Sequence, residues 1–184
     1  PTAPKTPWRQ RPSHQGARAM PGQPQVVALG AAFAGTETMQ ATARGTAWHL
    51  AFRTLAQRPD MADCLPKATG LDAGTLAQIG LQATRLRERL AAEGFPDLHF
   101  ELPIQIDLPE GAQLNGVIDL LAEGPEGLVI VDHKTGGGYC SGYWPQLAAY
   151  ADAAAQALGR PVRRVGIHWM NAGTLEMLEL PDGR

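Results

Sequence analysis

The chain has 184 residues, 44% of them hydrophobic and 18% charged, and a formal net charge of −2 at pH 7. This composition is typical of one globular domain with a substantial core, and the charge does not by itself indicate a nucleic-acid partner. No apolar run approaches the roughly 18 residues of a membrane-spanning helix, so we expect no membrane partner. The two cysteines, Cys64 and Cys140, form no C-x-x-C pair, and with no signal-peptide pattern they predict a reducing, cytoplasmic setting.

Residues 1–30 differ in character from the rest of the chain. They contain six prolines and show no periodic apolar pattern. Such a segment is typical of a linker or a poorly ordered arm. We therefore expect the folded domain to occupy residues 31–184.

Two helices are predicted next. Residues 38–57 place Trp48 and Phe52 among alanines, and Pro59 ends this helix because proline lacks the N–H group and clashes with the preceding turn. The second helix begins after Asp72, whose carboxylate can cap the first turn, and it ends at Gly94. Its apolar stripe recurs every three or four residues, at Leu76, Ile79, Ala83, Leu86 and Leu90.

The pattern then changes to a period of two. Apolar and polar residues alternate over residues 98–107, which predicts a strand with one apolar face and with Glu101 on the opposite face. Its apolar residues are Leu98, Phe100, Leu102, Ile104 and Ile106. The turn sequences "PEGA" and "EGPEG" separate this strand from "QLNGVIDLLAE" and "LVIVDHK", which predicts an antiparallel three-strand meander. The last strand is apolar on both faces, so we expect it at the centre of the sheet, under helices.

The remaining residues predict one more helix and a hairpin. Pro145 suits the first turn of a helix, which continues through alanines to Gly159 and Pro161. "VRRVGIHWM" and "TLEMLEL" then flank the turn "NAG". The order of elements predicts an α/β fold in which helices flank a mixed sheet.

Acidic residues gather in the meander. Asp132 and Lys134 are two apart in a strand, so both point the same way, and Asp119 and Glu101 lie on the neighbouring strands. Buried carboxylates are costly without compensation, and a divalent cation such as Mg²⁺ supplies it. A lysine beside the metal can orient or deprotonate a water. The competing interpretation is an ordinary salt bridge at a strand end.

The order of these motifs resembles a known nuclease family. "GVIDLL", "LVIVDHKT" and "QLAAY" resemble the RecB-type exonuclease branch of the PD-(D/E)xK superfamily, in particular the carboxy-terminal nuclease domain of helicase–nuclease subunits such as AddA and RecB. The matching residues are Gly116, Asp119, Asp132, Lys134, Gln146 and Tyr150. "RGTAWH" resembles the family's helical motif that ends in a histidine, here His49, and "ELP" resembles its first-strand acid, here Glu101. The resemblance implies a restriction-endonuclease-like mixed sheet.

The resemblance also implies a role for each matching residue. His49, Asp119, Asp132 and the carbonyl of His133 would bind the metal, which is Mg²⁺, although Mn²⁺ suits a histidine ligand better. Lys134 would be the catalytic lysine and Glu101 an auxiliary acid. The remaining two residues, Gln146 and Tyr150, lie four apart on one helix face, so both can reach the site and the DNA strand, with ordinary packing as the alternative.

The implied function is a metal-dependent DNA exonuclease domain of a helicase–nuclease, acting in double-strand break repair and recombination on single strands fed by a helicase region or partner. A catalytically silent DNA-binding or docking module with the same fold stays open, as does a stand-alone endonuclease. Two cysteines are too few for the iron–sulfur cluster of some family members. The glycines of "TGGGY" are either a mobile connection that leaves room for DNA or a plain loop.

Overall fold

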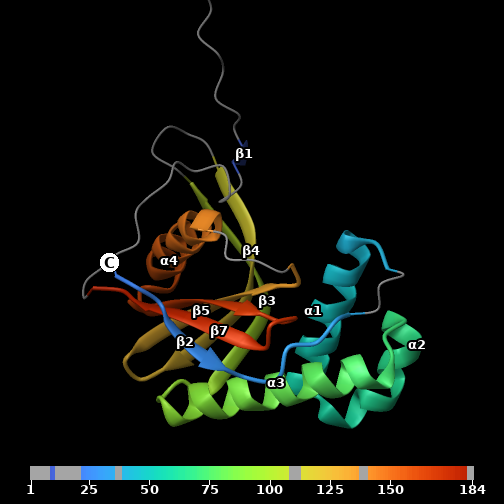
Figure 1. Cartoon of the computed structure of the whole chain (residues 1–184). Coiled ribbons are helices and arrows are strands. Elements are labelled where there is room, and N and C mark those ends of the chain that lie inside the picture. Colours follow the sequence, from blue (N-terminus) through green and yellow to red (C-terminus); the bar gives the residue numbers. More distant parts are fainter. Residues whose placement is uncertain (1–8, 11–21, 36–38, 108–112, 137–140, 182–184) are drawn as a thin grey trace, which may run out of the picture.

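A seven-stranded mixed sheet forms the centre of the molecule, with helices on both faces (Figure 1). The computed structural model describes residues 9–10, 22–35, 39–107, 113–136 and 141–181. Its strands are β1 (Arg9–Gln10), β2 (Gln25–Ala28), β3 (Asp97–Asp107), β4 (Gln113–Gly124), β5 (Gly127–Lys134), β6 (Val162–Trp169) and β7 (Thr174–Glu179). Its helices are α1 (Ala41–Gln57), α2 (Leu65–Thr69), α3 (Ala73–Ala92) and α4 (Trp144–Leu158), with 3₁₀ turns η2 (Pro59–Cys64) and η3 (Ser141–Tyr143).

The sheet topology confirms the predicted α/β fold. β3, β4 and β5 form the expected antiparallel meander, and β6 and β7 form the expected hairpin. β5 and β6 are parallel, and α4 makes the crossover between them. β2 closes one edge against β7, and β1 pairs with the start of β4.

Two apolar clusters, one on each face of the sheet, hold the helices in place. The first joins α1, α2 and α3 to one face, and the second joins α4 to the other (Figure 1). β5 serves both, because Leu128 and Ile130 pack toward α4 while Val129 and Val131 pack toward α1 and α3. This confirms the prediction that β5 lies centrally under helices.

The predicted helix signals act as expected. The Asp72 carboxylate accepts a hydrogen bond of 2.8 Å from the Thr75 N–H and caps α3. Pro145 lies in the first turn of α4, and Gly159 follows that helix with a φ of +63°. No described helix combines the length and the apolar character that crossing a membrane requires.

The structure contains elements that the sequence analysis did not predict. Residues 25–28, assigned to the linker, form β2, and Leu29 directly after them is buried. The short segment η2 and α2 between the first two long helices was also missed. Most of the predicted linker lies outside the described residues, as do Cys140 and two glycines of "TGGGY", Gly137 and Gly138.

Candidate metal centre and active site

The candidate site begins where two neighbouring strands are distorted. The register of β3 with β4 is continuous on both sides of Glu101 and places it opposite Asp119. The flanking register pairs are Phe100 with Leu120 and Leu102 with Ile118. Glu101 has a φ of +52°, which side-chain-bearing residues rarely adopt and which costs of order 1–2 kcal/mol. Such strain at a single residue needs a reason in the surrounding structure.

The distortion changes which face of the strand is buried. Leu98 and Phe100 pack with the α1–α3 cluster, whereas Leu102 and Ile104 pack with the α4 cluster. A regular strand would put all four on one face, as the alternation predicted, so that prediction is wrong beyond Glu101. β4 changes face in the same way at the residue opposite Glu101. Because both strands change their buried face at this position, the carboxylates of Glu101 and Asp119 lie outside the two apolar clusters.

His49 of α1 completes a cluster with these two acids. Its Nδ1 lies 3.6 Å from Asp119 Oδ1 and 3.9 Å from Glu101 Oε1. Its Nε2 lies 3.0 Å from the carbonyl oxygen of His133, which can only accept, so Nε2 carries the proton and donates. Nδ1 therefore points its lone pair, or a second proton, at the carboxylates. A hydrogen bond from the other ring nitrogen is the usual way in which a ligand histidine is oriented.

The backbone of His133 ties the cluster to the central strand. Its N–H donates a hydrogen bond of 2.8 Å to Asp119 Oδ2, while its carbonyl accepts from His49. One residue of β5 thus fixes a side chain from β4 and another from α1. The site is built on main-chain hydrogen bonds inside the sheet, which makes it rigid.

These residues suit a divalent cation. One donor atom each from His49, Glu101 and Asp119 lie within 4.8 Å of one another. The gaps of 3.6 and 3.9 Å are too long for direct hydrogen bonds, so the three side chains face one another around a shared space. A cation in that space would contact all three, and oxygen with one nitrogen suits Mg²⁺ or Mn²⁺.

The ionisation of Asp119 reflects the same crowding. The pKa of Asp119 is raised to about 6, chiefly by burial and then by repulsion from Asp132, while His49, the His133 N–H and Lys134 oppose the rise. Asp119 is therefore a costly anion in the ion-free site at neutral pH. A carboxylate whose ionisation is unfavourable in the ion-free site is stabilised most when a cation binds beside it.

Asp132 and Lys134 project together from the end of β5, as their spacing predicted. Lys134 Nζ lies 2.6 Å from Asp132 Oδ2 and 4.6 Å from the centre of the Tyr143 ring. Burial raises the pKa of Asp132, with Lys134 opposing it, while for Lys134 burial lowers the pKa but Asp132 outweighs burial and leaves it raised. Lys134 is accordingly a fixed cation in the ion-free site.

The sequence profile of the PD-(D/E)XK nuclease superfamily matches residues 26–179. The chain belongs to this superfamily. No curated protein matches the chain. The mixed sheet flanked by helices is the fold expected of a PD-(D/E)XK nuclease.

The motif in the superfamily's name can be located in the structure. Asp132, His133 and Lys134 match the (D/E)XK pattern at the end of β5, and Asp119 on β4, with Ile118 before it in place of the proline, is the predicted first acid. Asp132 is held by Lys134 rather than by the three-residue cluster. Its role as a metal ligand, and that of the His133 carbonyl, stay predictions.

The glycine of the "GVIDLL" motif has a packing role. A Cβ at Gly116 would lie 2.7 Å from Tyr150 Cε1 and 2.8 Å from its hydroxyl oxygen, so only glycine lets the tyrosine lie against β4. Gln146 Nε2 donates to this hydroxyl at 3.3 Å, from the same face of α4. Burial raises the Tyr150 pKa, and Asp132 and Asp119 add to the rise, which places the ring within electrostatic range of the acids.

The sequence analysis missed a buried chain of polar groups behind the site. Gln82 Nε2 donates to the Met170 carbonyl at 2.9 Å, so its Oε1 accepts from His168 Nε2 at 2.9 Å. The Nδ1 of His168 must then accept from His133 Nδ1, 3.0 Å away. Burial lowers the pKa of His168 to about 3 and that of His133 well below its usual range, so both rings are neutral. Histidines at separate places in the sequence carry no motif, and only the fold pairs them.

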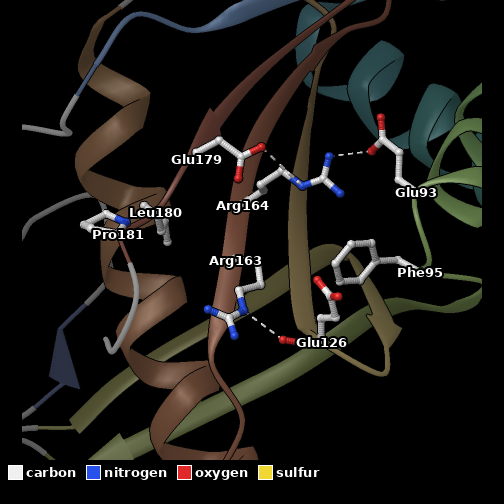
Figure 2. Close-up of a pocket in the computed structure, with 8 residues that line it drawn as sticks. All are labelled: Glu93, Phe95, Glu126, Arg163, Arg164, Glu179, Leu180 and Pro181. Atoms are coloured by element: carbon white, nitrogen blue, oxygen red, sulfur yellow. Dashed lines mark hydrogen bonds and ion pairs between the residues drawn. The ribbon is translucent and has the colours of Figure 1, made fainter.

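Two cavities differ in their relation to this centre. One of about 440 Å³ opens directly beside His49 and Glu101 and continues along α1 to Arg53. Another, of about 550 Å³, lies around the start of β6 and the end of β7 (Figure 2). There the guanidinium of Arg164 forms ion pairs with Glu93 and Glu179, so the positive charge of Arg164 is neutralised by the protein's own carboxylates. Of these two cavities, only the first is lined by residues of the candidate metal cluster.

Proposed function

We propose that this chain is the metal-dependent DNA exonuclease domain of a RecB/AddA-type helicase–nuclease that acts in double-strand break repair and recombination. Membership of the PD-(D/E)XK superfamily supports nuclease chemistry, and the motif order supports the RecB/AddA branch. The observation that carries the proposal is the cluster of His49, Glu101 and Asp119 beside the Asp132–Lys134 pair. A helicase region or partner subunit would supply single-stranded DNA.

His49, Glu101 and Asp119 would hold the ion, and Asp132 and the His133 carbonyl would adjoin it. The donor set favours Mg²⁺ or Mn²⁺, the histidine being more favourable to Mn²⁺. When bound, such an ion would supply a Lewis acid that polarises the phosphodiester and acidifies the attacking water.

The protein's own groups would position the water and balance the charge. Lys134 is held by Asp132 at 2.6 Å with its ammonium group charged, so it would orient the water and offset negative charge that develops on the phosphate. The water would lose a proton as its oxygen forms the new bond to phosphorus, and the bond to the 3′ oxygen would break. The 3′ oxygen would take up a proton, leaving a 5′ phosphate and a 3′ hydroxyl. Gln146 and Tyr150 would contact the DNA strand beside the acids.

The test is digestion of end-labelled linear single-stranded DNA with Mg²⁺ or Mn²⁺. We expect the wild-type chain to release short products, EDTA to stop the reaction, and Lys134→Ala to lower the rate by roughly 10³-fold or more. The matched control is Lys67→Ala, which removes an exposed lysine of α2 far from the acids in sequence. Equal activity of Lys134→Ala and wild type would refute the assignment of the lysine.

Two further measurements separate the alternatives. Circular DNA resists an exonuclease and is cut by an endonuclease, so comparing circular with linear substrate tests the exonuclease assignment. Calorimetric titration with Mg²⁺ and Mn²⁺ tests the metal site directly. No binding at millimolar metal would favour a silent DNA-binding module instead.

A further inference from the structure

A third and smaller cavity, of about 210 Å³, lies on the other flank of α1 from the 440 Å³ cavity. Its lining residues come from four parts of the chain, namely the segment after β2, the first half of α1, the end of β5 and the end of β6. Those that matter here are Phe33, Gly35, Arg44, Trp48, Thr135 and Asn171. Nothing in the metal centre uses these side chains.

Three buried polar atoms around this cavity have no hydrogen-bond partner. They are Arg44 Nε, Trp48 Nε1 and Asn171 Oδ1. Trp48 is only 1% exposed, and it is one of the residues that line the cavity. Leaving a buried donor or acceptor unpaired costs about 1–3 kcal/mol, and native proteins rarely collect several at one place. The two larger cavities lined by described residues have no such atom in their walls.

The walls of the cavity are fixed. The Phe33 ring stacks on the Trp48 ring with centroids 4.8 Å apart and planes at 13°. A Cβ at Gly35 would lie 2.5 Å from the Trp48 ring, so the glycine lets the chain pass close to the indole. Phe33 covers one face of the indole and the ring is almost fully buried, so the N–H is the polar group that Trp48 brings to the cavity wall. This excludes base stacking on Trp48 and favours hydrogen bonding.

The cavity and the metal centre are neighbours on two elements at once. Trp48 precedes His49 on α1, and Thr135 follows Lys134 at the end of β5. α1 and this end of β5 touch, because a Cβ at Gly45 would lie 3.6 Å from Thr135 Oγ1.

The chemistry of the lining selects an anion. Arg44 brings a positive charge, and no described carboxylate lines the cavity or pairs with the guanidinium. The indole N–H and the Thr135 hydroxyl add neutral donors, and the Asn171 amide presents a donor in place of its oxygen when rotated by 180°. Guanidinium, hydroxyl and N–H donors around a small space are typical of a phosphate site.

We propose that this cavity binds a phosphate group of the substrate strand next to the phosphate that is cleaved. The ligand is either an internal phosphodiester or the terminal 5′ phosphate. The proposal rests on the proposed function in taking the ligand from DNA and in placing the cleaved phosphate at Lys134 and the acids. Arg44 holds the phosphate, Trp48 and Thr135 donate to it, and the adjacent phosphate then lies at Lys134 and the acids. Arg44 is a positioning residue in this arrangement.

The test measures DNA binding without cleavage, so its outcome is independent of catalysis. Fluorescence anisotropy in EDTA, at one low salt concentration, follows two labelled single-stranded oligonucleotides that differ only in a 5′ phosphate or 5′ hydroxyl. Arg44→Gln is compared with Arg87→Gln, which removes an equal charge from an exposed position of α3. We expect Arg44→Gln to weaken binding about tenfold or more and Arg87→Gln to change it less than twofold.

Each result has a defined meaning. Equal weakening on both oligonucleotides supports an internal phosphodiester, and weakening limited to the 5′-phosphorylated one supports the terminal phosphate. Wild-type affinity for Arg44→Gln on both would overturn the proposal. Thermal unfolding checks that the variant is folded, and Thr135→Val, which keeps the side-chain shape without the hydroxyl, gives a second test with an expected loss of about threefold. A chain that binds DNA through Arg44 but does not cleave would contradict the proposed function and leave the phosphate site standing.

Discussion

Replacing Asp119 by asparagine should stabilise the ion-free protein while it removes metal binding. The pKa of Asp119 is raised to about 6 from an ordinary 3.8. The difference is about 2.2, and at about 1.36 kcal/mol for each pKa unit, ionising this group in the folded chain costs up to about 3 kcal/mol. Asparagine avoids that cost and keeps an oxygen to accept the 2.8 Å hydrogen bond from the His133 N–H.

The pH dependence of the effect follows from proton linkage. Between pH 3.8 and about 6 the folded chain binds more protons than the unfolded chain, so wild type loses stability as the pH rises through this range. Asp119→Asn lacks this loss. Its advantage is therefore largest above about pH 6, and it shrinks to under about 1 kcal/mol near pH 4, where Asp119 is protonated in the folded wild type.

The assay is thermal unfolding in EDTA at pH 8 and near pH 4, followed by addition of Mn²⁺ or Mg²⁺ at pH 8. Three kcal/mol corresponds to a rise in Tm of roughly 6–12 °C for a chain of this size. Metal should raise the Tm of wild type and leave that of Asp119→Asn unchanged. Glu88→Gln removes an exposed acid of α3 and should show neither effect.

A lower Tm for Asp119→Asn in EDTA at pH 8 would refute the reasoning, because it would mean that the carboxylate stabilises the ion-free fold. An advantage of equal size at both pH values would also refute it, since a packing effect does not follow the protonation of Asp119.

Three further outcomes are expected. Gly116→Ala should lower the free energy of unfolding by about 1–3 kcal/mol in a urea titration, because the new methyl group displaces Tyr150. Lys134→Met should cost about 3 kcal/mol by leaving the buried carboxylate of Asp132 unpaired, and a double variant with Asp132→Asn should recover most of that loss in the same titration. His168→Leu should flatten the loss of stability as the pH falls from 6.5 toward 3, since wild-type His168, with a pKa of about 3, stays neutral in the folded chain while the unfolded chain takes up a proton.

The elements with strong local patterns could be predicted from the sequence. The stripe and cap of α3, the meander around "GVIDLL" and the proline start of α4 each depend on neighbours within a few residues. β2 could not be predicted, because its four residues become a strand only by pairing with β7 about 150 positions later. The prolines around β2 instead predicted a linker.

The site was predictable in its residues and less so in its geometry. Spacing in a strand was enough to bring Asp132 and Lys134 together. The resemblance placed His49, Asp119 and Glu101 in one site, and the structure brings them together. The change of face of β3 at Glu101 could not be predicted, because it depends on a positive φ that the alternation of apolar and polar residues does not reveal. The pairing of His133 with His168 likewise joins residues 35 apart, on parallel strands that the sequence does not align.

The strained backbone at Glu101 offers a way to distinguish proteins of this fold that bind the metal from proteins of this fold that have lost metal binding. Glycine adopts a φ of +52° freely, so a fold freed from metal chemistry would gain stability by exchanging Glu101 for glycine or by straightening β3. A glutamate that is kept at this position despite the positive φ indicates that selection maintains metal binding in the chain. The residue at position 101 is thus a marker of metal binding. The Glu101→Gly variant should be inactive and easier to produce than the wild-type chain.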